Sequence, residues 1–599
     1  MEKQILADGN QIIASAALDA GIDFFTHYPG SPVNRVANAL ERHKPNDLVI
    51  NNALNEHVST LSAMGASLCG ARSLVVMKHV GLNIAADPLN YSAVCKIRGG
   101  MVVVVGTDPG ARSSTGEEDV HWYAPQFNLP LLEPATPQGL YDSIKEGFEI
   151  SERHRLPVLV FVPGRLAYQS GLVQRSATSR QQRSFSFEKD QSTLINVGQR
   201  AVVNHRDHIQ RMAACASEAY PVKTLFNQHS KTGLITRSAT FSVVAETVEM
   251  LGLQEQVYLL NIERSYPLHV DSLLNFAKDK HEIIIIEDQD GFLETMIKRD
   301  LFGKLSCQVD GKNHFPAWGE ISIEQVTDFL AHKFGLELQD QTLIENGLAP
   351  ERPGTFCEGC PHRASFFAID QALKKDDGII GGDIGCSSLP PHRTDWLLCM
   401  NAGIGISQGI ASVLPHQSMV STGGEGSFFH GGINSLQSAI ENNINLTHIL
   451  FDNRSIAMTG HQDSPTSHSK TDMKALLKAI GVDHVFEVNA FSPRAMADTL
   501  LKANGKDGVK VLWVRGNCAL QADEEMQRRR EERFLKIDNS RCGECTLCYE
   551  ALQCPAIERT AQHALEINMS RCRRCAACLD VCPNKAIIVT DPALETVDA

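Results

Sequence analysis

Cysteines in two short runs near the C-terminus restrict this 599-residue chain more than any other feature. The first run has the spacing Cys-x2-Cys-x2-Cys-x5-Cys-Pro, and the second has Cys-x2-Cys-x2-Cys-x3-Cys-Pro. Eight of the seventeen cysteines belong to these runs, which extend from Cys542 to Cys582. Such a concentration indicates metal or cluster ligation in a reducing compartment rather than a disulfide framework.

The second run has the spacing of bacterial ferredoxins that carry two [4Fe-4S] clusters. In that arrangement three closely spaced thiolates bind one cluster, and the fourth, which precedes proline, binds the other. The predicted ligand sets are therefore Cys542, Cys545, Cys548 and Cys582 for one cluster, and Cys572, Cys575, Cys578 and Cys554 for the other. The longer x5 spacing indicates a loop insertion rather than a lost ligand. Zinc is disfavoured, because four-cysteine zinc sites use two Cys-x2-Cys pairs.

Composition excludes several other classes of function. A net charge of −14 argues against non-specific binding of nucleic acid, which needs a basic surface. No apolar run reaches the roughly 18 residues of a membrane span, so no membrane partner is expected. The N-terminus lacks the pattern of a secretory signal, and the expected location is cytoplasmic.

Strand-like apolar segments alternate with helix-like segments over most of the chain, which is typical of parallel sheets covered by helices on both faces. The predicted strands are residues 23–28, 48–52, 73–78, 101–107 and 157–162, then 231–235, 256–260 and 282–287, and finally 378–382, 418–422, 447–452 and 510–515. The predicted domains are residues 1–173, a polar linker at 174–192, then 193–340, 341–522 and 523–599. The charged segment 523–533 is expected to form an exposed helix.

A glycine turn, Gly424-Glu425-Gly426, stands between a predicted strand and a helix over residues 432–443. Such a turn can bring backbone N–H groups to a diphosphate. Asn453 follows the next strand, 28 positions after Glu425. Their oxygens suit Mg2+, which prefers oxygen ligands together with phosphate. The pattern resembles the thiamine diphosphate motif, with Glu425 replacing the usual aspartate. Taken alone, an ordinary turn between strand and helix explains it as well.

Further motifs resemble the indolepyruvate:ferredoxin oxidoreductases of the 2-oxoacid:ferredoxin oxidoreductase superfamily. Residues 355–363 (TFCEGCPHR), 382–386 (GDIGC) and 457–462 (AMTGHQ) resemble the diphosphate-binding domain. Residues 28–33 (YPGSPV), 78–89 (KHVGLNIAADPL) and 108–114 (DPGARSS) resemble the pyrimidine-binding domain. The resemblance covers essentially the whole chain. It implies an α/β multidomain fold with two thiamine-binding parallel-sheet domains, a transketolase-C-like α/β domain and a ferredoxin-like domain.

The same resemblance implies roles for individual residues. Glu56 would protonate the aminopyrimidine ring from a site sheltered by Ala53, Leu54 and Val58, although an isolated Asn-Glu pair more often marks a solvated helix start. Ser31 would face the substrate. The metal contacts would be Glu425, Asn453 and the carbonyl of Ser455. The diphosphate end would be lined by Asp383, Gly385, Cys386, Gly424 and Gly426, with Asn453 and His461 nearby.

The remaining cysteines and histidines receive simpler interpretations. Cys357 and Cys360 are expected in a loop that faces the cofactor, and His79 and His362 are candidates for polar contacts or plain structural hydrogen bonds. Six cysteines are expected to be buried small apolar residues: Cys69, Cys95, Cys215, Cys307, Cys399 and Cys518.

The function that the resemblance implies is oxidative decarboxylation of an aryl 2-oxoacid such as indolepyruvate. The acyl group would leave on coenzyme A, and electrons would pass through two [4Fe-4S] clusters to ferredoxin. Thiamine diphosphate and Mg2+ would be cofactors, and a separate small subunit would complete an α2β2 assembly. Three alternatives stay open: another 2-oxoacid, branched-chain or phenyl; a non-oxidative decarboxylase or ligase; and an electron-transfer subunit with an inactive thiamine site.

Overall fold

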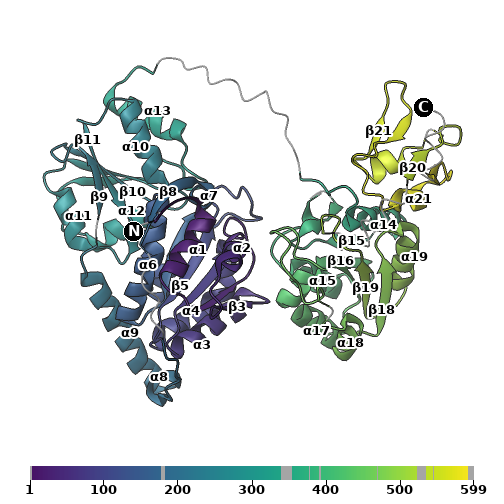
Figure 1. Ribbon diagram of the computed structural model, residues 1–599, viewed down its shortest axis with the longest axis horizontal. Coiled ribbons are helices and arrows are strands. Elements are labelled where there is room, and N and C mark those ends of the chain that lie inside the picture. Colours follow the sequence, from purple (N-terminus) through teal and green to yellow (C-terminus); the bar gives the residue numbers. More distant parts are fainter. Residues whose placement is uncertain are drawn as a thin grey trace. The chain divides into compact units, whose positions relative to one another are not determined.

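The computed structural model describes residues 3–176, 183–220, 222–338, 354–376, 378–389, 393–468, 470–521, 534–543 and 545–590. The chain forms two compact units, Met1–Glu345 and Asn346–Ala599, and each is described by itself (Figure 1). The predicted exposed helix at residues 523–533 lies outside the described residues.

A seven-stranded sheet forms the centre of the first unit. Its order is β12 (Arg264–Tyr266), β6 (Leu131–Leu132), β7 (Val158–Pro163), β5 (Met101–Thr107), β4 (Ser73–Lys78), β2 (Phe24–His27) and β3 (Val49–Asn52). All neighbours are parallel except β12, which runs antiparallel to β6. A separate antiparallel pair joins β1 (Lys3–Asp8) to β8 (Ser170–Arg175), so residues 174 and 175 of the predicted linker are strand residues.

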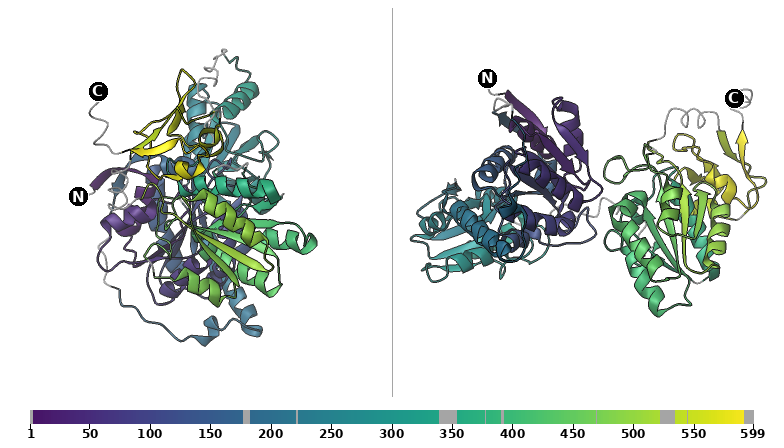
Figure 2. Two further views of the ribbon diagram at one scale, coloured as in Figure 1. Left: turned by 90° about the vertical axis from the view of Figure 1, so that its right-hand side faces the viewer. Right: turned by 90° about the horizontal axis from the view of Figure 1, so that it is seen from below.

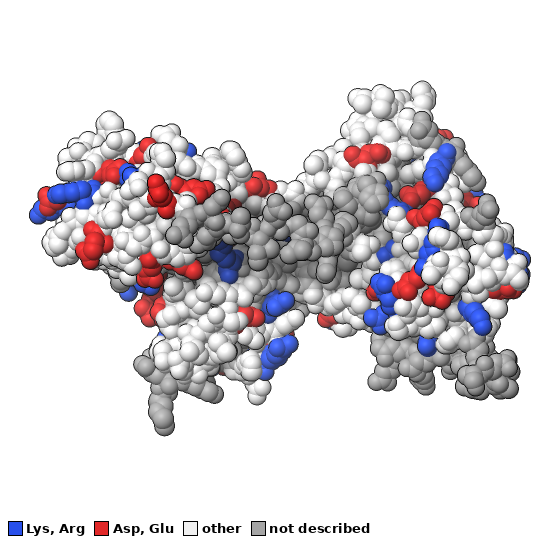
Figure 3. Space-filling view, turned by 90° about the horizontal axis from the view of Figure 1, so that it is seen from above, with Lys and Arg blue, Asp and Glu red and all other residues white. Residues whose placement is uncertain are grey.

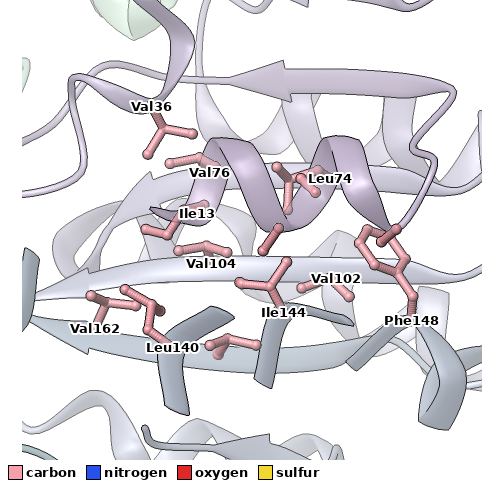
Figure 4. Packing of buried hydrophobic residues seen from close by; sticks show 14 of the residues in the cluster. Ile13, Val36, Leu74, Val76, Val102, Val104, Leu140, Ile144, Phe148 and Val162 are labelled. Carbon is pink, nitrogen blue, oxygen red and sulfur yellow. The ribbon is translucent and has the colours of Figure 1, made fainter. Parts of the chain in front are cut away.

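Helices cover both faces of this sheet because its central strands carry apolar side chains on both sides. One face packs against α1 (Gly9–Asp19), α2 (Val36–His43) and α6 (Pro137–His154), as Figure 4 shows. The other face packs against α3 (Glu56–Leu68) and α4 (His79–Val94). Within β5, Val102 and Val104 belong to the first core while Val103 and Val105 belong to the second, which follows from the two-residue period of a strand.

A five-stranded sheet completes the first unit. Its order is β14 (Gln308–Asp310), β13 (Glu282–Ile286), β10 (Thr232–Arg237), β11 (Val257–Ile262) and β9 (Lys223–Phe226). Helices α10 (Thr240–Met250) and α13 (Ile323–Phe334) cover one face. The other face, with α11 (Val270–Ala277) and α12 (Phe292–Asp300), shares one hydrophobic core with the seven-stranded sheet.

A buried ionic network also joins the two sheets. Arg237, at the end of β10, donates to Glu133 at 2.6 Å and to Glu287 at 3.0 Å. His121 lies 2.8 Å from Glu133 and is also hydrogen-bonded to Asp119. All five side chains are nearly inaccessible to solvent. Charges buried this deeply are stable only while all their partners are present, because removing one partner leaves another buried charge uncompensated.

The second unit has a fully parallel sheet. Its order is β15 (Ile379–Gly381), β16 (Met419–Gly424), β17 (Leu446–Asp452), β19 (Val509–Arg515) and β18 (His484–Asn489). One face is covered by α14 (Pro361–Asp376) and α19 (Pro493–Asn504). The other is covered by α15 (Ala402–Val413), α17 (Ile433–Glu441) and α18 (Met473–Ala479). All twelve predicted strands of the three sheets are confirmed, with ends that shift by at most two residues.

The cysteine runs fold into a small substructure with two antiparallel pairs. Strand β20 (Phe534–Ile537) pairs with β23 (Ile587–Thr590), and β21 (Ile557–Arg559) pairs with β22 (Leu565–Ile567). The short helix α21 (Ala577–Val581) lies within the second run and contains Cys578. Phe367 of α14 belongs to its hydrophobic core, and Arg494 of α19 donates its backbone N–H to Asp580 at 2.9 Å. The substructure therefore packs on the α14–α19 layer, as the yellow ribbon in Figure 2 shows.

The surface shows no segregation of charge on the face drawn in Figure 3, where acidic and basic residues are interspersed. Among the helices of the described residues, none is both long and apolar enough to cross a membrane.

Candidate active site and iron–sulfur centres

The motif loops of the first unit lie at the carboxyl ends of its parallel strands, which is where open α/β sheets bind ligands. Glu56 follows β3 as the first residue of α3, and Asn55 caps that helix by accepting from the N–H of Val58 at 2.9 Å. Glu56 is only 4% exposed, so it is not the solvated helix-start charge that the sequence alone favoured.

The shelter around Glu56 comes from α4. A Cβ at Gly81, in the first turn of α4, would lie 2.4 Å from the Glu56 Oε1 atom, so the absence of a side chain there makes room for the carboxyl group. The prediction that Leu54 and Val58 provide the shelter is wrong, because these side chains are 45% and 43% exposed. They point outward at the helix start, while the Glu56 side chain turns toward α4.

Four further motif residues lie at the same edge of the sheet. Ser31 is half-buried in the loop after β2. Lys78 ends β4 and donates to the carbonyl of Ser113 at 2.7 Å. Asp108, directly after β5, accepts from the N–H of Ser113 at 2.8 Å and from the hydroxyl of Ser114 at 2.5 Å. His79 begins α4 and is buried, and this burial lowers its pKa.

In the second unit, oxygen atoms converge where β16 and β17 end. The parallel register pairs Gly424 with Phe451 and so brings Glu425 beside the end of β17. The backbone N–H of Ser455 donates to Glu425 Oε1 at 2.8 Å and to Asn453 Oδ1 at 3.1 Å. Glu425, Asn453 and Ser455 are all buried. The three predicted metal contacts therefore lie together.

The chemistry of this donor set fits a hard cation. Burial, with the neighbouring Asp452 carboxylate, raises the pKa of Glu425 to about 8, which is the response of a carboxylate without a compensating positive charge. The buried hydroxyl of Ser455 has no hydrogen-bond partner among the residues that the structure describes. Asp452 itself is satisfied, because it accepts from Thr466 at 2.9 Å and from Trp513 at 3.0 Å. Two such oxygens beside a buried hydroxyl suit Mg2+.

Asp383 organises the loop beside this site. Its carboxylate accepts from the N–H groups of Ile384 at 2.7 Å and Asn401 at 2.9 Å, and from the Ser427 hydroxyl at 2.9 Å. Burial raises the pKa of Asp383 to about 7 although these hydrogen bonds oppose the shift. Asp383 thus ties together three segments that surround the predicted diphosphate end.

The remaining predicted cofactor positions lie in nearby loops. A Cβ at Gly385 or Gly424 would meet no atom within 4 Å, so both positions border open space, whereas Gly426 faces Ile456. The Nδ1 atom of His461 lies 3.9 Å from the Cys518 sulfur. His362 packs edge-on against Phe451, and burial lowers its pKa to about 4, which favours the neutral imidazole.

Four cysteines outside the terminal runs gather next to the Glu425 site. Burial, together with the nearby thiols of Cys360, Cys518 and Cys357, raises the pKa of Cys386 to about 12. The sequence interpretation separated these residues into a cofactor-facing loop, a diphosphate wall and a buried apolar cysteine. Cys518 is instead half-buried within a set of thiols. The Cys357-x2-Cys360 motif was the signal in the sequence for this set of thiols. The other two members, Cys386 and Cys518, lie 26 and 158 positions beyond Cys360 and could not be linked to it.

The prediction of plain buried cysteines holds only in part for the other five. Cys95 and Cys215 are buried, Cys69 and Cys307 are half-buried, and Cys399 is exposed.

The thiols of the terminal runs fall into two groups. Burial raises the pKa of Cys548 to about 11, helped by Cys542, Cys582 and Cys545. Burial likewise raises the pKa of Cys578, helped by Cys575, Cys554 and Cys572, and Cys548 contributes from the other group. Within the described residues, no three acidic, histidine or cysteine side chains are arranged to hold one metal ion. Thiols that surround a larger multi-iron cluster are compatible with that finding.

The second-run group lies against the Cys357–Cys360 loop. A pocket at this contact is lined by its four cysteines and also by Gly359, Cys360 and Arg363. At Gly359, where φ is +68°, a Cβ would lie 2.6 Å from the Cβ of Arg573. The loop can approach the second run this closely because glycine has no side chain and tolerates this backbone conformation.

Comparison with known families agrees with this geometry. Residues 15–237 match the family described as "Pyruvate flavodoxin/ferredoxin oxidoreductase, thiamine diP-bdg". Residues 383–514 match "Thiamine pyrophosphate enzyme, C-terminal TPP binding domain", and residues 534–583 match "4Fe-4S dicluster domain". The fold and its sites therefore define an oxidoreductase of the class that combines thiamine diphosphate with iron–sulfur clusters.

Sequence similarity to known proteins identifies the family within this class. The chain is 31% identical to the indolepyruvate oxidoreductase subunit IorA of Archaeoglobus fulgidus, over 97% of this chain and 96% of the relative. It is 30% identical to the subunit of the same name from Methanothermobacter marburgensis, over 92% and 91%. A solved 2-oxoglutarate:ferredoxin oxidoreductase from Magnetococcus marinus aligns with a TM-score of 0.45 and 16% identity, over 55% of this chain and 65% of that one. The chain belongs to the family of indolepyruvate oxidoreductase IorA subunits.

Proposed function

We propose that the chain catalyses the oxidative decarboxylation of an aryl 2-oxoacid of the indolepyruvate type. The acyl group would leave on coenzyme A, and the electrons would pass through iron–sulfur clusters to ferredoxin. The single observation that carries the proposal is the convergence of Glu425 and Asn453 in the same compact unit as the clustered thiols. Thiamine diphosphate, when bound, supplies the electron sink for the decarboxylation.

Within this proposal the chain's own residues bind, orient and hold protons. Glu425, Asn453 and the Ser455 carbonyl would hold Mg2+ and with it the diphosphate, and Asp383 fixes the neighbouring loops. Glu56 would share a proton with the aminopyrimidine nitrogen. Its burial against Gly81 supports this role, because the carboxyl group is withdrawn from bulk water and held in one place by the helix that packs on it. Ser31 would face the substrate.

The two terminal thiol groups would hold two [4Fe-4S] clusters with crossed ligands, so that Cys554 and Cys582 each serve the cluster of the other run. The set Cys357, Cys360, Cys386 and Cys518 is proposed to hold a third iron–sulfur cluster. Its support is the same mutual influence of thiols that groups the terminal cysteines. Electrons would pass from the cluster at Cys386 to the second-run cluster and then to the first-run cluster.

Iron content tests the third cluster. Cys518→Ser should lower the iron content of the anaerobically purified protein by about four atoms per chain, since a cubane cluster holds four iron atoms. Cys399→Ser is the matched control, because Cys399 is exposed and is not a member of any thiol group described above. An unchanged iron content in Cys518→Ser would limit the protein to the two terminal clusters.

A second subunit is part of the proposal. The relatives are named as subunits of an oxidoreductase, which supports a separate small subunit and an α2β2 assembly. Mass measurement of the native complex, purified through a tag on this chain, tests the stoichiometry.

The activity is tested anaerobically with a viologen dye and a panel of indolyl, phenyl and branched-chain 2-oxoacids. Dye reduction that requires both a 2-oxoacid and coenzyme A supports the proposal, and the fastest member identifies the substrate. Release of aldehyde without dye reduction would assign the chain to the non-oxidative decarboxylases. Purified protein that binds no thiamine diphosphate would leave only an electron-transfer role.

A further inference from the structure

A buried arginine lies between two of the thiol groups. Arg363 is in the first turn of α14 and is only 6% exposed. It lines the same pocket as the four second-run cysteines and Cys360. Cys554 and Cys360 are the two groups whose negative charge would stabilise its guanidinium most.

The guanidinium of Arg363 also holds the backbone that leads into both thiol groups. One amino group donates to the carbonyls of Leu552, at 3.3 Å, and Gln553, and these residues directly precede Cys554. The other donates to the carbonyl of Phe356, which directly precedes Cys357. The Nε–H is buried without a hydrogen-bond partner.

The charge of Arg363 is not balanced by an ion pair within the described part of the chain. Among the described residues, no carboxylate lies within ion-pair distance of Arg363, and the nearby Glu358 is 3.5 Å from Arg571 instead. Arg393 provides a contrast in the same region. It also donates to this segment, at the Ala551 carbonyl (3.1 Å), but its charge is balanced by an ion pair with Asp370.

We propose that Arg363 raises the reduction potential of the cluster held by Cys554, Cys572, Cys575 and Cys578. The inference rests on the proposed iron–sulfur centres of this chain but not on the identity of the substrate. When the cluster accepts one electron its net charge becomes more negative, and a nearby uncompensated positive charge in a water-poor environment stabilises that state. The cluster nearest to the Cys360 loop therefore accepts electrons more readily than its burial alone would allow.

The test is a redox titration of the full-length protein with dithionite and mediators, followed by electron paramagnetic resonance. The signal of the second-run cluster is assigned by its loss in Cys554→Ser. Arg363→Gln and Arg363→Met remove the charge, whereas Arg363→Lys keeps it. The matched control is the double variant Arg393→Gln/Asp370→Asn, which removes a neighbouring arginine without changing the net charge. No substrate is present, so failure of the proposed activity would not affect the result.

We expect both neutral variants to shift the midpoint of the second-run cluster to lower potential while iron content stays unchanged. The lysine variant and the double variant should titrate close to the unmodified protein. A neutral variant that titrates like the double variant would overturn the proposal. So would a lysine variant that shifts as far as glutamine, since geometry rather than charge would then be responsible. Loss of the cluster from both neutral variants, with retention in the lysine variant, would also overturn it by assigning Arg363 to cluster assembly.

Discussion

Single residues show how much of the site a sequence can predict. Glu425 and Asn453 could be predicted as neighbours, because each directly follows a parallel strand and adjacent strands end at the same edge. The burial of Glu56 could not, since it depends on Gly81, which is 25 positions away on another helix. The proximity of Cys518 to Cys386 could not be predicted for the same reason. A lone cysteine carries no local pattern, and only the fold brings it to Cys386.

At Glu56, replacement by glutamine should reduce turnover by about 10²–10⁴-fold, the usual contribution of an acid–base group. The side chain keeps its shape, so the fold and the iron content should not change. Turnover is measured with viologen and iron with a colorimetric assay. Glu41→Gln, on exposed α2, is the control. Activity above about a tenth of the unmodified protein would contradict the assigned role.

Secondary-structure elements were predicted well where they are fully buried. The central strands read as continuous apolar runs, whereas the edge strands β9, β14 and β18 and the two-residue β6 carry no such run. The pairing that connects the two sheets of the first unit could not be predicted either. Strand β12 is three residues long and contains Arg264, so nothing local indicates that it completes the other sheet.

The close approach of α4 to α3 leads to a prediction about Gly81. Alanine there would meet the Glu56 carboxyl group and displace it, so turnover should fall by about 10²-fold, as a misplacement of about 1 Å can cost that much. Gly65→Ala, within α3, meets no atom within 4 Å and should be neutral or slightly stabilising. Equal activity of the two variants would show that Glu56 adjusts freely.

The buried ionic network leads to a prediction about pH. Burial and Arg237 by themselves lower the pKa of His121, but the carboxylates of Asp119 and Glu133 outweigh them and raise it to about 9. The folded state therefore holds a proton that the unfolded chain loses near pH 6.5. The stabilisation is complete below pH 6.5 and is lost as the pH rises to about 9.

The measurement is the free energy of unfolding of the first unit, monitored by denaturant at several pH values. The unmodified protein should become less stable between pH 6.5 and 9, and His121→Gln should show a smaller loss over the same window. His332→Gln, at an exposed position of α13, should follow the unmodified protein. Parallel curves for His121→Gln and the unmodified protein would exclude His121 as the titrating group.

At the scale of the whole molecule, the domain order could be predicted because each motif belongs to a different domain. The extent to which neighbouring domains share one hydrophobic core could not be predicted. The first two α/β sheets have one continuous hydrophobic core, and the ferredoxin-like substructure packs on α14 and α19 through Phe367 and Arg494. Such packing depends on long-range complementarity that a motif does not record.

The proposed order of clusters leads to a prediction for Cys582. Replacement by serine should damage the first-run cluster, because the predicted ligands are crossed, and leave the second-run cluster intact. Substrate should still reduce the second-run cluster, while transfer to ferredoxin becomes slow. Electron paramagnetic resonance and ferredoxin reduction are measured together, with Cys399→Ser as the control. Damage to the second-run cluster instead would overturn the predicted pairing.

The glycine at position 359 has a consequence for descent. Any side chain there would strain the backbone and push away the second cysteine run. Few relatives that still transfer electrons between the two thiol groups could tolerate a substitution of Gly359, even where their substrate pockets differ. We therefore expect Gly359 to be conserved among relatives that use different 2-oxoacids. We expect it to be replaced first in relatives that no longer transfer electrons between these thiol groups.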